Sequence, residues 1–314
     1  MLAEVYFAKR GNDKLIAYTN AKSQNVFLSI VQADLAPRLG EVIITEQTYD
    51  IKTVIQQMFE LDIYKQENIK IGVKNKCIWK PLMVGDMGRE LNYTVYELCK
   101  AKRDLSVLIQ KLQEILLYVE PASKCLQTYS HKLRELLILA CTEFESSLKS
   151  YGFGNNERTS DYIKILDFID LKKYKIELAG YSERFQSMPF VDWSISEPTK
   201  SLSWYYAYTQ TKHNRIGSFN LATLENCIHA ICANIIMFTI RYSPHSLYNE
   251  TDVCSSLVRN TFALRIEDTE DVYIPIIEGE KRCSGAFSSS VSFKNGKRID
   301  NVFDMHKILP FEHR

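Results

Sequence analysis

The apolar run from Cys227 to Ile240, CIHAICANIIMFTI, is the feature that most limits how this chain can fold. A helix needs about 20 apolar residues to cross a bilayer, and this run is shorter and contains His229 and Asn234. We therefore predict a buried helix and no membrane contact. Apolar residues at helical spacing extend the seam over residues 221–242: Leu221, Leu224, Ile228, Ile231, Ile235, Phe238 and Tyr242. Such a helix is expected in the middle of a bundle, with Ser218 or Asn220 as its N-cap.

Other segments between residues 87 and 245 also have helical periodicity. One helix is expected up to Val119, where Pro121 stops it, and a shorter one over DYIKILDFIDLKKY. An aromatic helix is expected from near Thr199 to near Arg215. The helix predicted over 127–151 has one broad apolar face, made of Leu133, Leu136, Leu137, Ala140, Cys141, Phe144, Leu148 and Tyr151. Arg134 and Glu145 border that face on one side and Glu143 on the other.

The two ends of the chain are instead rich in β-strand patterns. VFLSIV, EVIIT and the alternating ENIKIGVKNKCIW predict strands near the N-terminus, and the lysines of the last suit an edge strand. TFALRI, VYIPII and VSFKNGKRI predict strands near the C-terminus, with a hairpin turn at Asn295-Gly296. We therefore expect an α+β fold: a β-rich domain over 1–86, a central antiparallel helical bundle over 87–245 and a β-rich segment over 246–314. The pattern leaves open whether the two β-rich parts pack together.

Charge and cysteine usage exclude several classes of protein. The net charge of +1 provides no overall basic field, so nucleic-acid binding would need a local patch. The eight cysteines form no CxxC pair and no zinc-ribbon spacing, which predicts reduced core thiols and no metal site. No cofactor motif is present, and the N-terminus lacks a signal-peptide core. We expect a cytoplasmic protein.

The stretch from Tyr205 to Arg215, YYAYTQTKHNR, closes with three basic residues and is followed by Gly217. Basic side chains near a helix C-terminus interact favourably with the helix dipole, which is one explanation of the cluster. On a continuous helix Lys212 and Arg215 share a face, whereas His213 and Arg215 diverge by about 200°. If the helix unwinds before Gly217, all three can converge on one phosphate.

The order of these helices resembles that of the HEPN superfamily. The resemblance is carried by LRELLILACTEFESSLKSYG, the helix containing DY, and WYYAYTQTKHNRIGSFNLATLENCIHAI with its apolar helix, roughly residues 127–242. It implies a dimeric helical protein of bacterial toxin–antitoxin or anti-phage systems. Many such proteins are metal-independent ribonucleases, and many others only bind.

The HEPN catalytic motif has four to six residues between Arg and His, because His moves the ribose 2′-hydroxyl proton while Arg stabilises the charge on phosphorus. Neither Arg241 with His245 nor Arg298 with His306 has this spacing. The resemblance therefore implies a site at the basic cluster, with a carboxylate from the facing helix. The candidate residues are Lys212, His213, Arg215, Glu143 and Glu145. We expect the two most apolar helices to lie antiparallel and to hold the cations at their shared rim.

Two functions follow from this interpretation. The protein either engages RNA or a partner protein in a bacterial defence or toxin–antitoxin-type system, with endoribonuclease activity at the cluster, or serves as a non-catalytic scaffold in an assembly. A homodimer through the apolar face of the last helix fits both. Outside the cluster, His229 lies one turn after Glu225, which suits either a core histidine or a proton relay.

Overall fold

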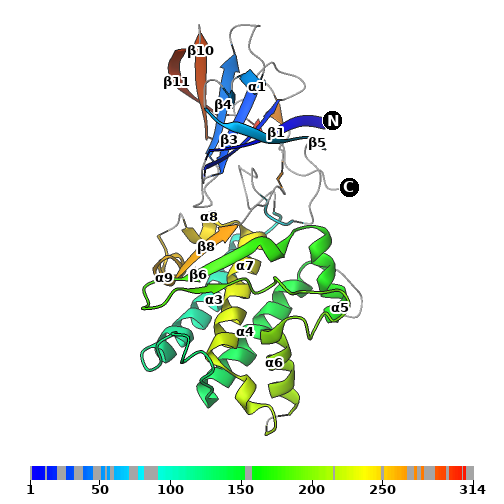
Figure 1. The fold of residues 1–314 in the computed structure, drawn as a ribbon, viewed down its shortest axis with the longest axis vertical. Helices are drawn as coiled ribbons and strands as arrows, with labels where there is room; N and C mark the ends of the chain where they lie inside the picture. The colour runs from blue at the N-terminus through cyan, green and yellow to red at the C-terminus, as the bar shows by residue number, and fades with distance from the viewer. Residues whose placement is uncertain are drawn as a thin grey trace. The chain divides into compact units, whose positions relative to one another are not determined.

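The computed structural model describes residues 2–10, 13–19, 26–31, 38–44, 51–53, 55–56, 60–70, 77–80, 91–152, 158–214, 216–248, 251–266, 272–273, 277–278, 287–294, 297–305 and 307–308. It contains helices and sheets and belongs to the α+β class, as expected (Figure 1). The chain divides into two compact units. Unit 1 comprises residues 1–75, 80–92 and 270–314, and unit 2 comprises residues 76–79 and 93–269.

Unit 1 is built on a seven-stranded sheet with the order β11-β10-β4-β3-β2-β1-β5. Its strands are β1 Leu2–Arg10, β2 Asp13–Thr19, β3 Val26–Val31, β4 Arg38–Ile44, β5 Asp62–Lys70, β10 Phe287–Lys294 and β11 Lys297–Met305. The pair of β9 Ile277–Glu278 with β12 Lys307–Ile308 and the short helix α1 Ile51–Thr53 complete the unit. β5 ends the sheet and alternates between exposed and half-buried residues, which agrees with the edge strand predicted there.

The two β-rich ends of the chain therefore belong to one sheet. β10 pairs in parallel with β4, with Val291 opposite Val42, and every other pairing in this sheet is antiparallel. The division of the chain differs from the boundaries expected at residues 86 and 245. Residues 246–269 contain two helices and a strand of unit 2, because the strand adds to a sheet of that unit. The expected turn at 295–296 lies outside the described residues.

Unit 2 combines helices with a three-stranded antiparallel sheet of order β7-β6-β8. Its longer helices are α3 Val95–Leu116, α4 His131–Lys149, α6 Ser203–His213, α7 Leu224–Tyr242 and α9 Val253–Thr261. Shorter helices are α5 Thr159–Tyr162 and α8 His245–Tyr248, with 3-10 turns η2 Ile163–Asp167, η3 Leu171–Lys173 and η4 Phe219–Leu221. The strands are β6 Tyr174–Leu178, β7 Phe185–Ser187 and β8 Phe262–Ile266.

Helix α7 forms the core of unit 2, as its apolar character predicts. Every residue from Ala230 to Ile240 is buried, and α3, α4, α6 and α8 all contact this helix (Figure 1). Its N-cap is Thr223, whose hydroxyl accepts the Asn226 N–H at 3.2 Å, rather than the expected Ser218 or Asn220. Those two residues lie at or inside the turn η4, so the helix starts later.

The directions of α4 and α7 differ from the expectation. The Cys227 thiol donates to the Leu133 carbonyl at 3.1 Å, and the Asn234 amide donates to the Ala140 carbonyl at 2.8 Å. Both contacts join residues 94 positions apart, so α4 and α7 run parallel, not antiparallel. The reason is the connection between them, because α6 returns along α4 in the opposite direction before α7 begins.

A cluster of aromatic side chains joins α4 to α6 and to the segment 181–200. Phe144 contacts Trp204 with ring centroids 5.0 Å apart, and both Trp193 and Trp204 are almost fully buried. The two indole N–H groups donate to the carbonyls of Pro198 and Pro189 at 2.9 Å. The tryptophans are therefore core anchors, because each buries its ring and satisfies its only polar group.

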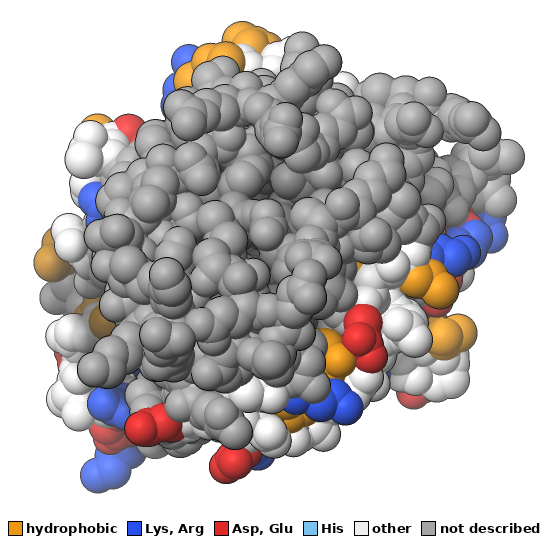
Figure 2. Space-filling view, turned by 90° about the horizontal axis from the view of Figure 1, so that it is seen from above, with side chains coloured by type: hydrophobic (Ala, Val, Ile, Leu, Met, Phe, Trp, Pro, Cys, Tyr) orange, Lys and Arg blue, Asp and Glu red, His pale blue; other side chains and the backbone are white. Residues whose placement is uncertain are grey.

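The charges on the described surface are mixed in sign. On the face drawn in Figure 2, lysine and arginine side chains lie interspersed with aspartate and glutamate among the residues that are coloured. This agrees with the net charge of +1. A polyanion would find no continuous basic field among the coloured residues of this face, so any such contact would be local.

Candidate functional site

The basic cluster lies where α6 ends. Lys212 and His213 are the last two residues of the helix and both are exposed. The chain then turns, because the Asn214 side-chain oxygen accepts the Gly217 N–H at 3.0 Å and the Asn214 carbonyl accepts the Ser218 N–H at 3.1 Å. Arg215 lies outside the described residues. The described cations therefore project from the C-terminal turn, where the helix dipole favours them.

Lys212 is connected to Glu145 through two tyrosines. Its ammonium donates to the Tyr208 hydroxyl at 3.0 Å, and the rings of Tyr208 and Tyr205 lie 5.6 Å apart. The Tyr205 hydroxyl donates to Glu145 Oε1 at 2.6 Å. The bond to Tyr208 is the main cause that raises the pKa of Lys212, and the charge of Glu145 adds to it. The structure thus places Glu145 beside α6, as expected, but without a direct ion pair to Lys212.

The second expected carboxylate, Glu143, does not reach this end of α6. Side chains two positions apart on a helix point about 200° away from each other. Glu143 and Glu145 therefore leave α4 on opposite sides. Arg134 shares the side of Glu145, and its guanidinium donates to the Thr211 carbonyl near the end of α6 at 3.1 Å. Among the described residues, the cluster therefore has one carboxylate nearby, and that carboxylate already accepts a bond from Tyr205.

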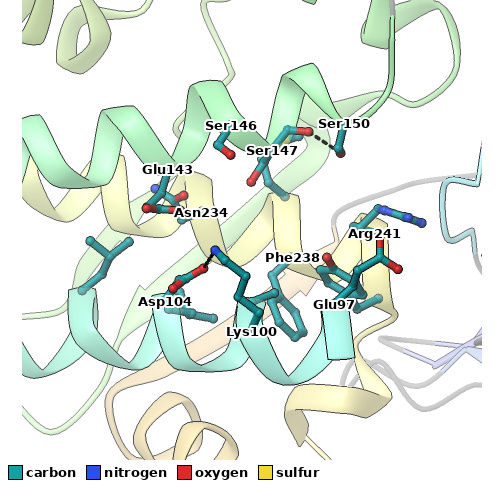
Figure 3. A pocket seen from close by; sticks show the side chains of 15 residues that line it. Glu97, Lys100, Asp104, Glu143, Ser146, Ser147, Ser150, Asn234, Phe238 and Arg241 are labelled. Atoms are coloured by element: carbon teal, nitrogen blue, oxygen red, sulfur yellow. Dashed lines mark hydrogen bonds and ion pairs between the residues drawn. The ribbon is translucent and has the colours of Figure 1, made fainter. Parts of the chain in front are cut away.

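Glu143 instead lies in a groove between α3, α4 and α7, shown in Figure 3. The groove encloses about 180 Å3. Its apolar floor includes Leu105, Leu108, Met237 and Phe238, and its polar lining includes Glu97, Lys100, Asp104, Glu143, Ser146, Ser147, Ser150, Asn234 and Arg241. We call it the α3–α4–α7 groove.

The α3–α4–α7 groove is lined by more acidic than basic side chains. Lys100 donates to Asp104 Oδ2 at 2.6 Å, the pair drawn with a dashed line in Figure 3. Burial is the main cause that raises the pKa of Glu143, the Asp104 carboxylate raises it further and Lys100 opposes both. Three carboxylates, Glu97, Asp104 and Glu143, face two cations, Lys100 and Arg241, which sum to −1. The groove is therefore a poor site for an anion.

His229 is a core histidine. Its Nδ1 lies 2.7 Å from the Ser187 hydroxyl, and its ring contacts Phe185 at 5.4 Å between centroids. Burial lowers the pKa of His229, and the nearby Glu225 only partly opposes this. Glu225 itself accepts a bond from the Gln127 amide at 2.7 Å. These contacts favour a packed, neutral imidazole over the proton relay that the sequence left open.

The residues that surround Glu143 have only weak signals in the sequence. Lys100 and Asp104 stand four apart on α3, a spacing that signals an ion pair but is common on solvated helices. Asn234 is a stronger signal than this spacing. A side-chain amide inside an otherwise apolar helix needs hydrogen-bond partners where it is buried. The sequence shows this anomaly, but only the structure shows which groove the amide faces.

Comparisons with known proteins do not indicate a function, so the geometry described above is the basis for proposing one. No protein-family model, curated protein or solved structure matches the chain. Within the part of the chain that the structure describes, no group of three His, Cys, Asp or Glu side chains is arranged to hold a metal ion. Within that same part, no helix has the length and apolar character to span a membrane.

Proposed function

We propose that the protein is a non-catalytic interaction subunit, a HEPN-like component of a bacterial anti-phage or toxin–antitoxin-type system. In this proposal it docks a protein partner through the end of unit 2 where α6 leads into α7. We call this surface the α6–α7 end. It consists of Tyr129, His131, Lys212, His213, Ile216 and Phe219.

The observation that carries the proposal is the exposed apolar side chain of Ile216, which is 95% accessible and close in sequence to the exposed Lys212 and His213. Tyr129 is 50% accessible and contacts the Phe219 ring at 5.6 Å, and the His131 ring contacts Phe219 at 4.7 Å. Aromatic and apolar anchors with a charged border are typical of protein–protein interfaces. The Lys212 ammonium favours a partner whose matching surface is acidic.

Cleavage of RNA is supported less well by the arrangement of these side chains. A ribonuclease of the HEPN type needs a proton-transfer group and a phosphate-stabilising group around the same atoms. Lys212 is bound to Tyr208, Glu145 is bound to Tyr205, and Glu143 lies in the α3–α4–α7 groove. Of the predicted site residues that the structure describes, only His213 is left at the α6–α7 end for proton transfer.

The second candidate is a metal-independent endoribonuclease, which the exposed positions of Lys212 and His213 side by side at the end of α6 favour. The test is incubation of the purified protein with total RNA in EDTA. Cleavage by the wild type that is lost in His213→Ala would support the ribonuclease. Intact RNA with both proteins would support the interaction subunit.

The interaction itself is tested by co-expression with the products of neighbouring genes, followed by purification of the complex. Ile216→Asp should abolish co-purification of a defined partner. Ile195→Asp is the matched control, because Ile195 is also exposed, at 78%, but lies outside the α6–α7 end. If Ile216→Asp retains every partner that the wild type binds, this surface is not the interface. Sedimentation of the wild type and Ile216→Asp alone tests whether the partner is a second copy of the chain.

A further inference from the structure

The amide of Asn234 is held so that its oxygen faces the α3–α4–α7 groove. The side chain is only 7% accessible, and its Nδ2 donates to the Ala140 and Ala230 carbonyls, both at 2.8 Å. Both N–H donors are thus used on the backbone of α4 and α7. The oxygen has no donor among the residues that the structure describes, and Asn234 lines the groove next to Glu143 (Figure 3). The oxygen is therefore an acceptor that a donor in the groove can reach.

The carboxylate of Glu143 completes a pair of acceptors. Glu143 is half-buried at the wall of the groove, close enough to Asp104 for their charges to interact. Asp104 is already paired with Lys100, whereas no bond to the Glu143 carboxylate is seen among the described residues. The net charge of −1 found for the groove leaves room for one further positive charge.

We propose that the α3–α4–α7 groove binds the protonated end of an alkylamine, with the ammonium between Glu143 and the Asn234 oxygen. An ammonium has three N–H donors and no acceptor, which matches a site made of acceptors. The aliphatic stem would lie on the apolar floor formed by Leu108 and Phe238. This site goes beyond the proposed docking function and does not depend on it.

The size and chemistry of the groove exclude other ligands. A drug-sized molecule needs a pocket of about 300–1,000 Å3, whereas a cavity of about 150 Å3 accepts a ligand as small as benzene. The groove, at about 180 Å3, therefore fits a lysine side chain or a small free amine. A phosphate or carboxylate would meet three carboxylates, and the cation Lys100 is already engaged. A metal ion lacks three suitable ligands among the described residues.

The test is an NMR titration of the full chain, following the Asn234 side-chain amide signals. The probes are n-butylammonium, its uncharged analogue n-butanol, and Nα-acetyl-lysine N-methylamide, which keeps the side-chain ammonium, all at constant ionic strength. We expect saturable shifts with the two ammonium probes, with dissociation constants of about millimolar order, and none with butanol. Glu143→Gln should weaken binding by about tenfold or more, because it removes a charge-assisted bond. Glu197→Gln is the control, because the Glu197 side chain is 59% exposed and does not line the groove, and it should bind as the wild type does.

The probes also distinguish the source of the amine. Tighter binding of the lysine derivative would assign the site to a lysine side chain of a protein, and tighter binding of butylammonium would assign it to a free amine. Absence of saturable shifts with both ammonium probes would overturn the proposal. Equal weakening by Glu143→Gln and Glu197→Gln would overturn it as well, because the effect would then be one of general charge.

Discussion

The ion pair between Lys102 and Asp252 should be one of the larger single contributions to the stability of unit 2. Lys102 Nζ lies 2.6 Å from Asp252 Oδ2, and the lysine side chain is only 11% exposed. Asp252 is also the N-cap of α9, where it accepts the Ser255 N–H at 3.1 Å. One carboxylate therefore joins α9 to α3 and caps α9 at the same time.

Two substitutions separate these roles. Asparagine caps a helix about as well as aspartate, so Asp252→Asn removes the charge and keeps the cap. The pair is intermediate between exposed pairs and buried ones, because the Asp252 side chain is 37% exposed. We expect a loss of about 1–3 kcal/mol in the free energy of unfolding. Asp252→Ala should cost about 1 kcal/mol more, since the cap is lost too.

The loss should depend on pH in a defined direction. Burial alone would raise the pKa of Asp252, but the bonds from Lys102 and Ser255 outweigh it and hold the pKa well below its usual value. A carboxyl with a lowered folded pKa stabilises the protein above the unfolded pKa of about 4, and this stability is lost as the pH falls below that value. The difference between wild type and Asp252→Asn should therefore shrink between pH 5 and pH 2.

Tryptophan fluorescence during urea unfolding measures this, because Trp79, Trp193 and Trp204 are the chain's three tryptophans and all are buried in unit 2. Glu197→Gln is the control, since the pair of Glu197 with Lys200 is 59% and 66% exposed and should contribute less than about 1 kcal/mol. Equal stability of wild type and Asp252→Asn at pH 7, or a difference that does not change on acidification, would refute the reasoning.

Two further predictions concern α6 and the core thiols. Tyr205→Phe removes the donor to Glu145 and should lower the free energy of unfolding by about 1–2 kcal/mol. The same fluorescence assay measures this loss. Tyr206→Phe, at an exposed neighbouring position, is the control and should have no effect. Iodoacetamide at pH 8 should label the exposed Cys99 of the native protein long before the buried Cys232, whose pKa burial raises to about 12. Peptide mass spectrometry of timed samples checks this, and equal labelling rates would contradict the packing of α7.

The sequence predicted the elements whose residue pattern is strong over their own length. Helix α7 is apolar on all sides because it is buried on all sides, and the β-branched runs of β3 and β4 form strands where they were expected. Helices α8 and α9 were missed, because they have only 4 and 9 residues and depend on tertiary contacts such as the one from Asp252 to Lys102. A short helix carries too few residues for its periodicity to stand out.

The candidate site was predicted only in part. The helical wheel of α4 already separates Glu143 from Arg134 and Glu145, and the structure has Arg134 and Glu145 facing α6. The direction of α7 relative to α4 could not be predicted, because it depends on the path of the long segment that connects them. The groove around Glu143 was missed for the same reason, since α3, α4 and α7 meet only in the folded chain.

The parallel pairing of β4 with β10 has a consequence for biosynthesis. Strands β1 to β4 leave the ribosome early. Strand β10 begins at Phe287, nearly 250 residues after β4 ends at Ile44. Until then the hydrogen-bonding edge of β4 lacks this neighbour, and an unpaired edge is prone to associate with other chains. A nascent or truncated chain that stops before residue 287 should therefore be a client for chaperones, even where unit 2 has already folded.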